Sequence, residues 1–132
     1  PLIIYDPRKG NRKGQIQKKI ALNIDIAPTI LSLAGVPTPS QMQGVNLLSK
    51  KLLNRKEFFY EHTFMGSPRL PKIEGVVKKN MKYMLFTEHN YEQLYLLNQD
   101  PLEKQNEALN SKHTKKLIQL RKEYEILKEK AK

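Results

Sequence analysis

The residues best suited to chemistry in this sequence are Glu61 and His62, which are adjacent and come shortly before a loop that contains Pro68 and Pro71. Their surroundings predict a strand that ends at this pair. A carboxylate and an imidazole in such a place can hydrogen-bond a polar ligand, because binding groups concentrate where a rigid element gives way to a loop. The alternative is a strand-end histidine that bonds only to the neighbouring loop.

Patterns for a nucleophile or a metal site are missing. The chain has no cysteine, which excludes disulfides, zinc–thiolate sites and thiol nucleophiles. His89 and His113 have no third ligand at a suitable spacing, so we expect no zinc site. Gly10 and Gly14 bracket a basic loop, but no Lys-Ser/Thr follows, so this is not a phosphate-binding loop.

Asp25 is a third carboxylate of interest, in the stretch NIDIAPTILSLAG. Pro28 is compatible with the first turn of a helix, whose N–H groups have no intrahelical partner. Asp25 can then cap the helix N-terminus, and Gly35 can end the helix with a positive φ. We therefore predict a buried helix over residues 25–34 and assign Asp25 to capping rather than catalysis.

The remaining pattern predicts an α+β fold in which a four-stranded antiparallel sheet is packed by a C-terminal amphipathic helix. The helix is expected from about Ser111 and the hairpin is expected to turn near Lys79 and Asn80. A strand and short helices should precede the sheet. The predicted strands and short helix are Leu2–Tyr5, Val45–Leu53 (helix), Glu57–Phe64, the hairpin Ile73–Phe86 and Glu92–Leu97.

The charge of the chain is strongly positive, at +11. Lysine outnumbers arginine among the basic residues, and lysines dispersed along a chain are typical of a solvated surface rather than of a nucleic-acid reader. The same charge would attract an acidic, for example sulfated, polysaccharide. No apolar run is long enough for a transmembrane helix, so we expect no membrane and no nucleic-acid partner.

Several motifs occur in the order found in one known family. The chain resembles the C-terminal region of type I, formylglycine-dependent sulfatases of the alkaline phosphatase superfamily. The motifs are PLIIYDP (Pro1–Pro7), NIDIAPTILSLAGVPTP (Asn23–Pro39), MQGVNLL (Met42–Leu48), FFYEH (Phe58–His62), EGVVKKNMKYMLF (Glu74–Phe86) and EQLYLLNQDPLEKQNEA (Glu92–Ala108).

This resemblance implies a hydrolase of sulfate esters, acting on sulfated saccharides, as the full-length parent. Family members use a formylglycine made from a C/S-x-P-x-R motif, with calcium holding the sulfate. Neither that motif nor a calcium-binding carboxylate pair is present in this sequence, and in the family both precede the PLIIYDP strand. We therefore assign no catalytic or metal residue, and expect calcium and formylglycine only in the full-length enzyme.

The resemblance also implies two structural parts. Residues 1–54 would end the large α/β sulfatase domain, to which the Leu2–Tyr5 strand and the Asp25 helix would belong, and residues 55–132 would form the C-terminal subdomain. The chain opens without an initiator Met, and we expect a fragment whose partner is the N-terminal catalytic domain. Without that partner, its apolar strand would favour self-association. The family implies a periplasmic or secreted location.

The candidate substrate-binding residues are His62, Glu61, Lys78 and Lys72. In the family, this subdomain borders the mouth of the active site, so His62 could bond a sugar hydroxyl or a sulfate. Val77 stands where many relatives have an arginine, and Lys78 would face the other side of the strand. We predict a fragment that is inert alone and contributes to substrate recognition and fold completion. The alternatives are a free-standing basic module that binds nucleic acid or another polyanion, and part of a related phosphoester hydrolase.

Overall fold

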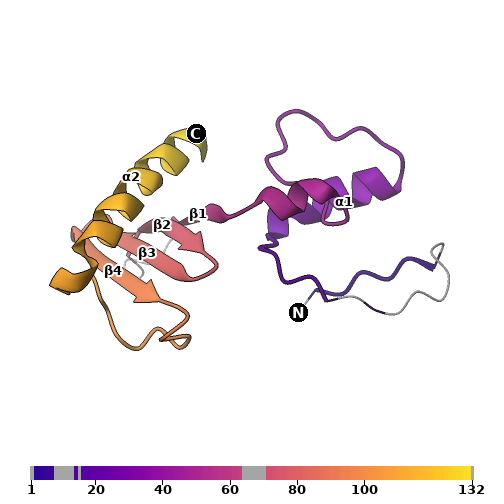
Figure 1. Ribbon diagram of the computed structural model, residues 1–132. Helices are drawn as coiled ribbons and strands as arrows, with labels where there is room; N and C mark the ends of the chain where they lie inside the picture. Colours follow the sequence, from indigo (N-terminus) through magenta and orange to yellow (C-terminus); the bar gives the residue numbers. More distant parts are fainter. Residues whose placement is uncertain (1, 8–13, 15, 64–70, 132) are drawn as a thin grey trace.

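The computed structural model describes residues 2–7, 14, 16–63 and 71–131 of the chain. Figure 1 shows two lobes joined by a short link. We call the described residues up to Asn54 the N-terminal lobe, and those from Glu57 onward the C-terminal lobe. Arg55 and Lys56 form the link between the last helix of the first lobe and the first strand of the second.

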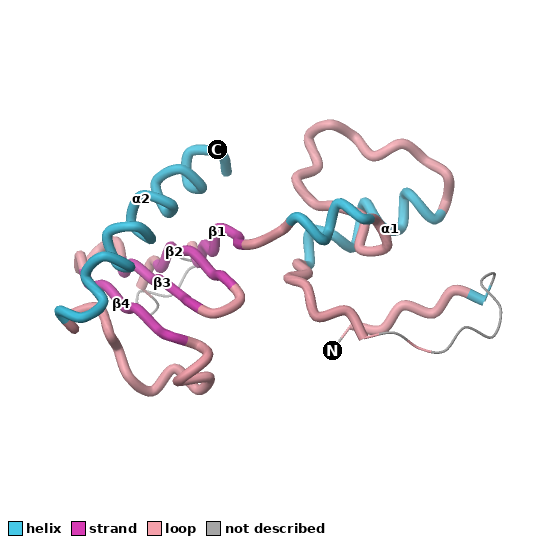
Figure 2. The backbone as a smooth tube through the Cα atoms, in the orientation of Figure 1, coloured by secondary structure: helices cyan, strands magenta, loops and turns pink. Residues whose placement is uncertain are grey.

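The C-terminal lobe is a four-stranded antiparallel meander in the order β1-β2-β3-β4. One long helix, α2 (Thr114–Ala131), follows the 3-10 turn η4 (Ser111–His113) and crosses one face of the sheet (Figures 1 and 2). The strands are β1 (Glu57–His62), β2 (Ile73–Lys78), β3 (Met81–Phe86) and β4 (Tyr91–Leu96).

The core lies between this sheet and α2. Strand alternation sends Val76, Tyr83 and Leu94 to the helix side in one cross-strand row. On α2, Leu117, Leu120 and Tyr124 repeat at three- and four-residue steps and are buried against that row. Burying each of these large side chains is worth about 1.5–3 kcal/mol, which gives a small lobe a stable centre.

The C-terminal lobe confirms the predicted α+β class, the four strands and the final helix. The hairpin turns at Lys79 and Asn80 as predicted. The strand predicted over Glu57–Phe64 ends at His62, and Phe64 lies outside the described residues. Strand β4 and the amphipathic helix begin within a few residues of their predicted starts.

The N-terminal lobe contains the 3-10 turn η2 (Asn23–Asp25), helix α1 (Ile26–Leu33) and the 3-10 helix η3 (Lys50–Asn54). Gly35 ends α1 with φ +72°, as predicted, and the Val36 N–H donates to the Leu31 carbonyl at 2.9 Å. This 6→1 bond is that of a Schellman motif, in which a glycine takes the left-handed conformation.

Three predictions for the N-terminal lobe are wrong in detail. The Val45–Leu53 helix is reduced to η3, because Asn46 Oδ1 accepts from the Leu48 N–H at 2.8 Å and so competes with helical bonding. Leu2–Tyr5 forms no strand, since no neighbouring strand pairs with it in the described chain. Helix α1 buries Pro28 and Thr29 but leaves Ile26 and Ile30 41% and 60% exposed, so it is not deeply buried.

Candidate functional site

The two residues of the Glu61–His62 pair point to opposite faces of the sheet. His62 pairs with Ile73, whose row continues through Phe86 to Tyr91 on the face that α2 does not cover. Glu61 pairs with Glu74, on the helix side. Both residues lie at the last rungs of β1, so the predicted place at a strand end is confirmed, while their role in binding stays a prediction.

The two candidate lysines lie at opposite ends of the β1–β2 ladder. Lys72 directly precedes β2 and is exposed, next to the rung that joins Ile73 to His62. Lys78 pairs with Glu57 at the other end of the ladder. Five residues of β2 separate this rung from the rung of Ile73 and His62, so the two rungs are about 17 Å apart. The structure places Lys72 at the same end of the ladder as His62 and Glu61, and Lys78 at the other end. By strand alternation Lys72 lies on the side of the sheet that Glu61 faces, whereas His62 faces the opposite side.

Lys78 is already engaged by two carboxylates. Its ammonium lies 3.0 Å from Glu57 and 2.7 Å from Glu123 of α2. Burial lowers the pKa of Lys78, but the hydrogen bonds to Glu123 and Glu57 outweigh this and raise it above its usual value. Lys78 therefore stays protonated and joins the sheet to the helix, and its predicted contact with substrate stays untested.

A shallow cleft of about 490 Å³ opens between α2 and strands β3 and β4. Glu92 lies in it and accepts a hydrogen bond from the Tyr83 hydroxyl at 2.6 Å and two from the Arg121 guanidinium. The bond from Arg121 is the main cause that lowers the pKa of Glu92, and burial opposes it. Since these charges satisfy one another, the cleft has the character of a structural polar network.

A similar network lies beside Glu61. Glu74 accepts a hydrogen bond from the Tyr124 hydroxyl and forms an ion pair with Lys128 at 2.6 Å. Lys128 also donates to the Tyr124 hydroxyl at 3.0 Å and lies over its ring. The second carboxylate of the Glu61–Glu74 rung is therefore committed to α2. Of the candidate substrate-binding residues, Glu61, Lys72 and His62 lie at this sheet end.

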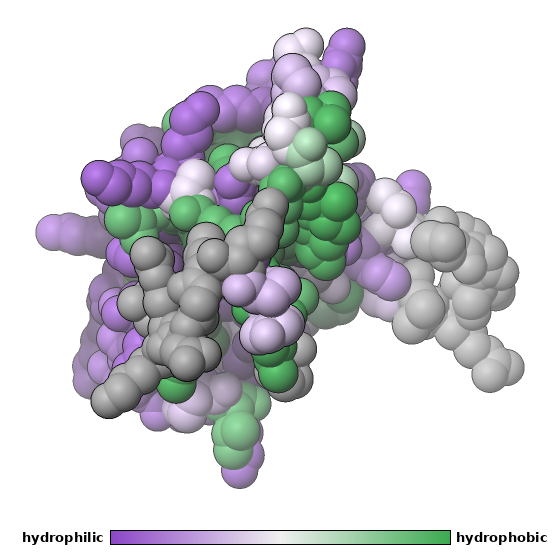
Figure 3. Space-filling model, turned by 90° about the vertical axis from the view of Figure 1, so that its right-hand side faces the viewer, coloured by the Kyte–Doolittle hydropathy of each residue, from purple (hydrophilic) through white to green (hydrophobic). Residues whose placement is uncertain are grey.

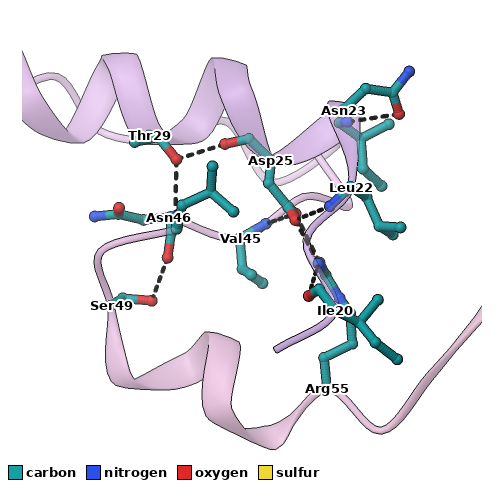
Figure 4. Close-up of polar contacts among 11 residues, drawn as sticks. Ile20, Leu22, Asn23, Asp25, Thr29, Val45, Asn46, Ser49 and Arg55 are labelled. Atoms are coloured by element: carbon teal, nitrogen blue, oxygen red, sulfur yellow. Dashed lines mark hydrogen bonds and ion pairs between the residues drawn. The ribbon is translucent and has the colours of Figure 1, made fainter. Parts of the chain in front are cut away.

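Asp25 does not cap its helix, which corrects the prediction. Its backbone is helical rather than extended, and no bond runs from its carboxylate into the first turn of α1. Oδ2 instead accepts from the Leu22 N–H at 2.8 Å, and Oδ1 accepts from the Val45 N–H at 2.9 Å (Figure 4). The Arg55 guanidinium adds a bidentate ion pair through both oxygens.

The carboxylate of Asp25 is 0% exposed and is saturated by these four donors. Burial alone would raise its pKa, but the bonds from Arg55, Val45 and Leu22 together hold it below its ordinary value. Sequence reasoning missed Arg55, which is separated from Asp25 by thirty residues in the chain and gives no local signal. The absence of catalysis at Asp25 stays a prediction, with burial as its physical basis.

No metal site can be built from the described part of the chain. In residues 2–7, 14, 16–63 and 71–131, no group of three or more His, Asp or Glu side chains could hold an ion. We therefore assign no metal-binding role to these residues. The same residues contain no helix with the length and apolarity needed to cross a bilayer.

Comparison with known proteins gives one consistent result. The family model "N-sulphoglucosamine sulphohydrolase, C-terminal" matches residues 1–130. The chain is 31% identical over 134 residues to the N-acetylglucosamine-6-O-sulfatase of Bacteroides thetaiotaomicron, with 91% of this chain covered. It is 29% identical over 124 residues to an arylsulfatase of Clostridium perfringens, with 89% covered.

Solved structures agree with these sequence matches. The structure of BT4656 in complex with its substrate D-glucosamine-2-N,6-O-disulfate superposes with a TM-score of 0.67 at 27% identity and covers 80% of this chain and 23% of that one. The structure of BT1596, a 2-O GAG sulfatase, gives a TM-score of 0.64 at 26% identity, over 74% of this chain and 22% of that one.

The chain spans about a quarter of the length of the curated relatives it matches, 25% of the arylsulfatase and 24% of the 6-O-sulfatase. Their similarity covers both lobes, since the family model runs almost from end to end. The ordered motifs, the antiparallel sheet with its covering helix and these matches lead to one identification. The chain belongs to the sulfatase family described as N-sulphoglucosamine sulphohydrolase, C-terminal.

Proposed function

We propose that this chain is the C-terminal part of a hydrolase of sulfate esters, and that it completes the fold of the enzyme and contributes to recognition of a sulfated saccharide. The observation that carries the proposal is the family match over residues 1–130. The relatives named above act on sulfated sugars or aryl sulfates, which supports a substrate of that class.

The proposed partner is an N-terminal catalytic domain that supplies the nucleophile and the metal ligands. A formylglycine nucleophile and calcium are expected there from the resemblance to sulfatases. Exposed apolar side chains of the N-terminal lobe support such a partner: they include Ile3, Tyr5, Ile16, Ile24, Ile26 and Ile30. Figure 3, which views this side of the molecule, shows green apolar patches beside the grey residues.

Recognition of substrate is proposed for the sheet end that carries His62, Glu61 and Lys72. An imidazole and an ammonium can donate to a sulfate or a sugar hydroxyl, and a carboxylate can accept from a hydroxyl. Lys78 is the weaker candidate, because two carboxylates already compensate its charge. A periplasmic or secreted location is proposed from the relatives, among which are extracellular sulfatases.

The proposal is tested by comparing two proteins: the 132-residue chain alone, and the longer polypeptide that contains it. Both are assayed with an aryl sulfate and with N-acetylglucosamine-6-sulfate. We expect chelator-sensitive sulfate release from the longer protein and none from the chain. Sulfate release by the chain, or release of phosphate but not sulfate by the longer protein, would contradict the proposal.

A further inference from the structure

The link between the two lobes starts at an ion pair whose carboxylate, that of Asp25, is fully buried. Arg55 follows η3 directly, and only Lys56 separates it from β1. Its guanidinium is anchored in the N-terminal lobe by both oxygens of Asp25 and by the Ile20 carbonyl at 3.3 Å. Arg55 therefore belongs to the linker by its backbone and to the N-terminal lobe by its side chain.

The Asp25 end of this pair is rigidly held. Its two oxygens accept from the backbone N–H groups of Leu22 and Val45, which come from segments on either side of α1. Thr29 reinforces the same place, because its hydroxyl donates to the Asp25 carbonyl at 2.6 Å and accepts from the Leu47 N–H at 2.9 Å. A saturated carboxylate on a fixed backbone gives the guanidinium one well-defined position.

Little else connects the lobes. In the described part of the chain, α1 and η3 make no extensive contact with the strands or with α2. The described core of the C-terminal lobe is built from residues of that lobe. Figure 1 shows the chain crossing between the lobes as a single strand-like connection into β1.

We propose that the Asp25–Arg55 ion pair is a clamp that fixes the direction in which the chain leaves the N-terminal lobe, and so positions β1 and the Glu61–His62 end of the sheet. Arginine suits this task because its planar fork binds a carboxylate through two parallel bonds, which restrains orientation as well as distance. A lysine keeps the positive charge, but its ammonium is a point charge without a planar fork, so it does not fix the orientation of the linker. The inference concerns the geometry of the lobes and does not depend on sulfatase activity.

The test measures the distance between the lobes by pulsed electron–electron double resonance in the 132-residue chain. The sequence has no cysteine, so Ala27→Cys on α1 and Lys115→Cys on α2 place two spin labels at exposed positions without background. Dilution with unlabelled chain limits the measured distances to pairs of labels within one chain. Arg55→Lys and Asp25→Asn are compared with the parent chain.

A matched control is available within the C-terminal lobe. Arg121 binds Glu92 through two hydrogen bonds, as Arg55 binds Asp25. Arg121 lies on α2 and Glu92 on β4, so this pair is wholly within the C-terminal lobe. We expect Arg55→Lys and Asp25→Asn to broaden the distance distribution, and Arg121→Lys and Glu92→Gln to leave it as narrow as in the parent. The same broadening in the control variants, or an unchanged distribution in Arg55→Lys, would overturn the clamp.

Hydrogen exchange distinguishes unfolding of the N-terminal lobe from a change in the direction of the linker. The Val36 amide, bonded to Leu31 across the end of α1, reports on the N-terminal lobe. We expect this amide to stay protected in Arg55→Lys while the distance distribution broadens. If protection is lost in both variants, the ion pair serves the stability of the N-terminal lobe and not the direction of the linker, and the proposal fails.

Discussion

Lys78 Nζ lies 2.7 Å from Glu123 Oε2, so an ion pair joins β2 to the middle of α2. Glu57, the rung partner of Lys78 on β1, lies 3.0 Å from the same ammonium. The three side chains are only partly exposed, at 20–29% of their side-chain surface. Lys78, which the sequence suggested for substrate binding, thus joins β1 and β2 to α2 through ion pairs.

Replacement of Lys78 by methionine should therefore reduce stability. We expect Lys78→Met to lower the free energy of unfolding by about 1 kcal/mol, the upper part of the range for partly exposed ion pairs, because two carboxylates lose their common partner. The change is measured by urea denaturation followed by circular dichroism. Lys79→Met, at the exposed hairpin turn, is the matched control and should change little. Equal effects of both substitutions would count against this account.

Gly44 is required by a close approach between backbones. A Cβ atom at this position would overlap the Ile24 carbonyl oxygen and lie 3.1 Å from the Asp25 Cα. We expect Gly44→Ala to destabilise the N-terminal lobe by about 1–3 kcal/mol, as overpacking against atoms that cannot yield. Hydrogen exchange of the α1 amides measures the loss. Gly14→Ala, with nothing within 4 Å of the added atom, should have no such effect.

The elements predicted best from the sequence are those whose pattern is complete within the chain. Strands β2 and β3 alternate about an evident turn, and α2 carries its apolar stripe at helical spacing, so each finds its partner in the C-terminal lobe. Leu2–Tyr5 shows the limit, because a strand is defined by its ladder and none of the described residues supplies one.

The candidate site was predictable in position but not in partners. The strand end at His62 followed from the local pattern, whereas the Asp25–Arg55 pair depends on segments thirty residues apart that only the fold brings together. The capping assignment of Asp25 failed for the same reason. The local sequence pattern is sufficient to predict a helix cap at Asp25. In the folded chain its carboxylate binds the Val45 N–H and the Arg55 guanidinium instead, and these donors come from distant segments.

Acid should weaken the C-terminal lobe. The pKa of Glu92 is lowered from 4.5 by hydrogen bonds from Arg121 and Tyr83, against burial. A lowered folded-state pKa gives stability that is fully present above the unfolded value and is lost as pH falls through the folded value. We expect the urea midpoint to fall as the pH drops below about 4.5. In Glu92→Gln the midpoint should be lower at pH 7 and fall less on acidification; an unchanged slope would contradict this origin.

The 132-residue chain should self-associate when it is isolated. Ile26 and Ile30 are 41% and 60% exposed on α1, and further apolar side chains of the N-terminal lobe are exposed in Figure 3. Contiguous apolar surface of this kind marks an interface. We expect concentration-dependent dimers or larger species in sedimentation velocity, reduced by Ile26→Lys together with Ile30→Lys. Leu109→Lys, on a residue 97% exposed in the C-terminal lobe, is the control and should not reduce association. A monomer at high concentration would contradict the prediction.

His62 is the residue on which substrate recognition by this chain can be tested most directly. Its side chain lies on the sheet face that α2 leaves uncovered, at the last rung of β1. If it donates to the saccharide, His62→Ala in the longer enzyme removes one hydrogen bond to a polar or charged group. Such a bond is worth roughly 1–3 kcal/mol, so kcat/KM for a sulfated saccharide should fall roughly tenfold to a hundredfold.

The contrast between two substrates decides between recognition and structure. If His62 contacts only the saccharide part of the substrate, hydrolysis of a small aryl sulfate should change little in His62→Ala. His89→Ala, in the exposed turn between β3 and β4, controls for the loss of a histidine and should leave both substrates unaffected. If kcat/KM falls equally for both substrates and thermal stability falls as well, His62 has a structural role, because the substitution has impaired folding and not a contact with substrate. If neither changes, recognition moves to Lys72, which shares this sheet end and is exposed.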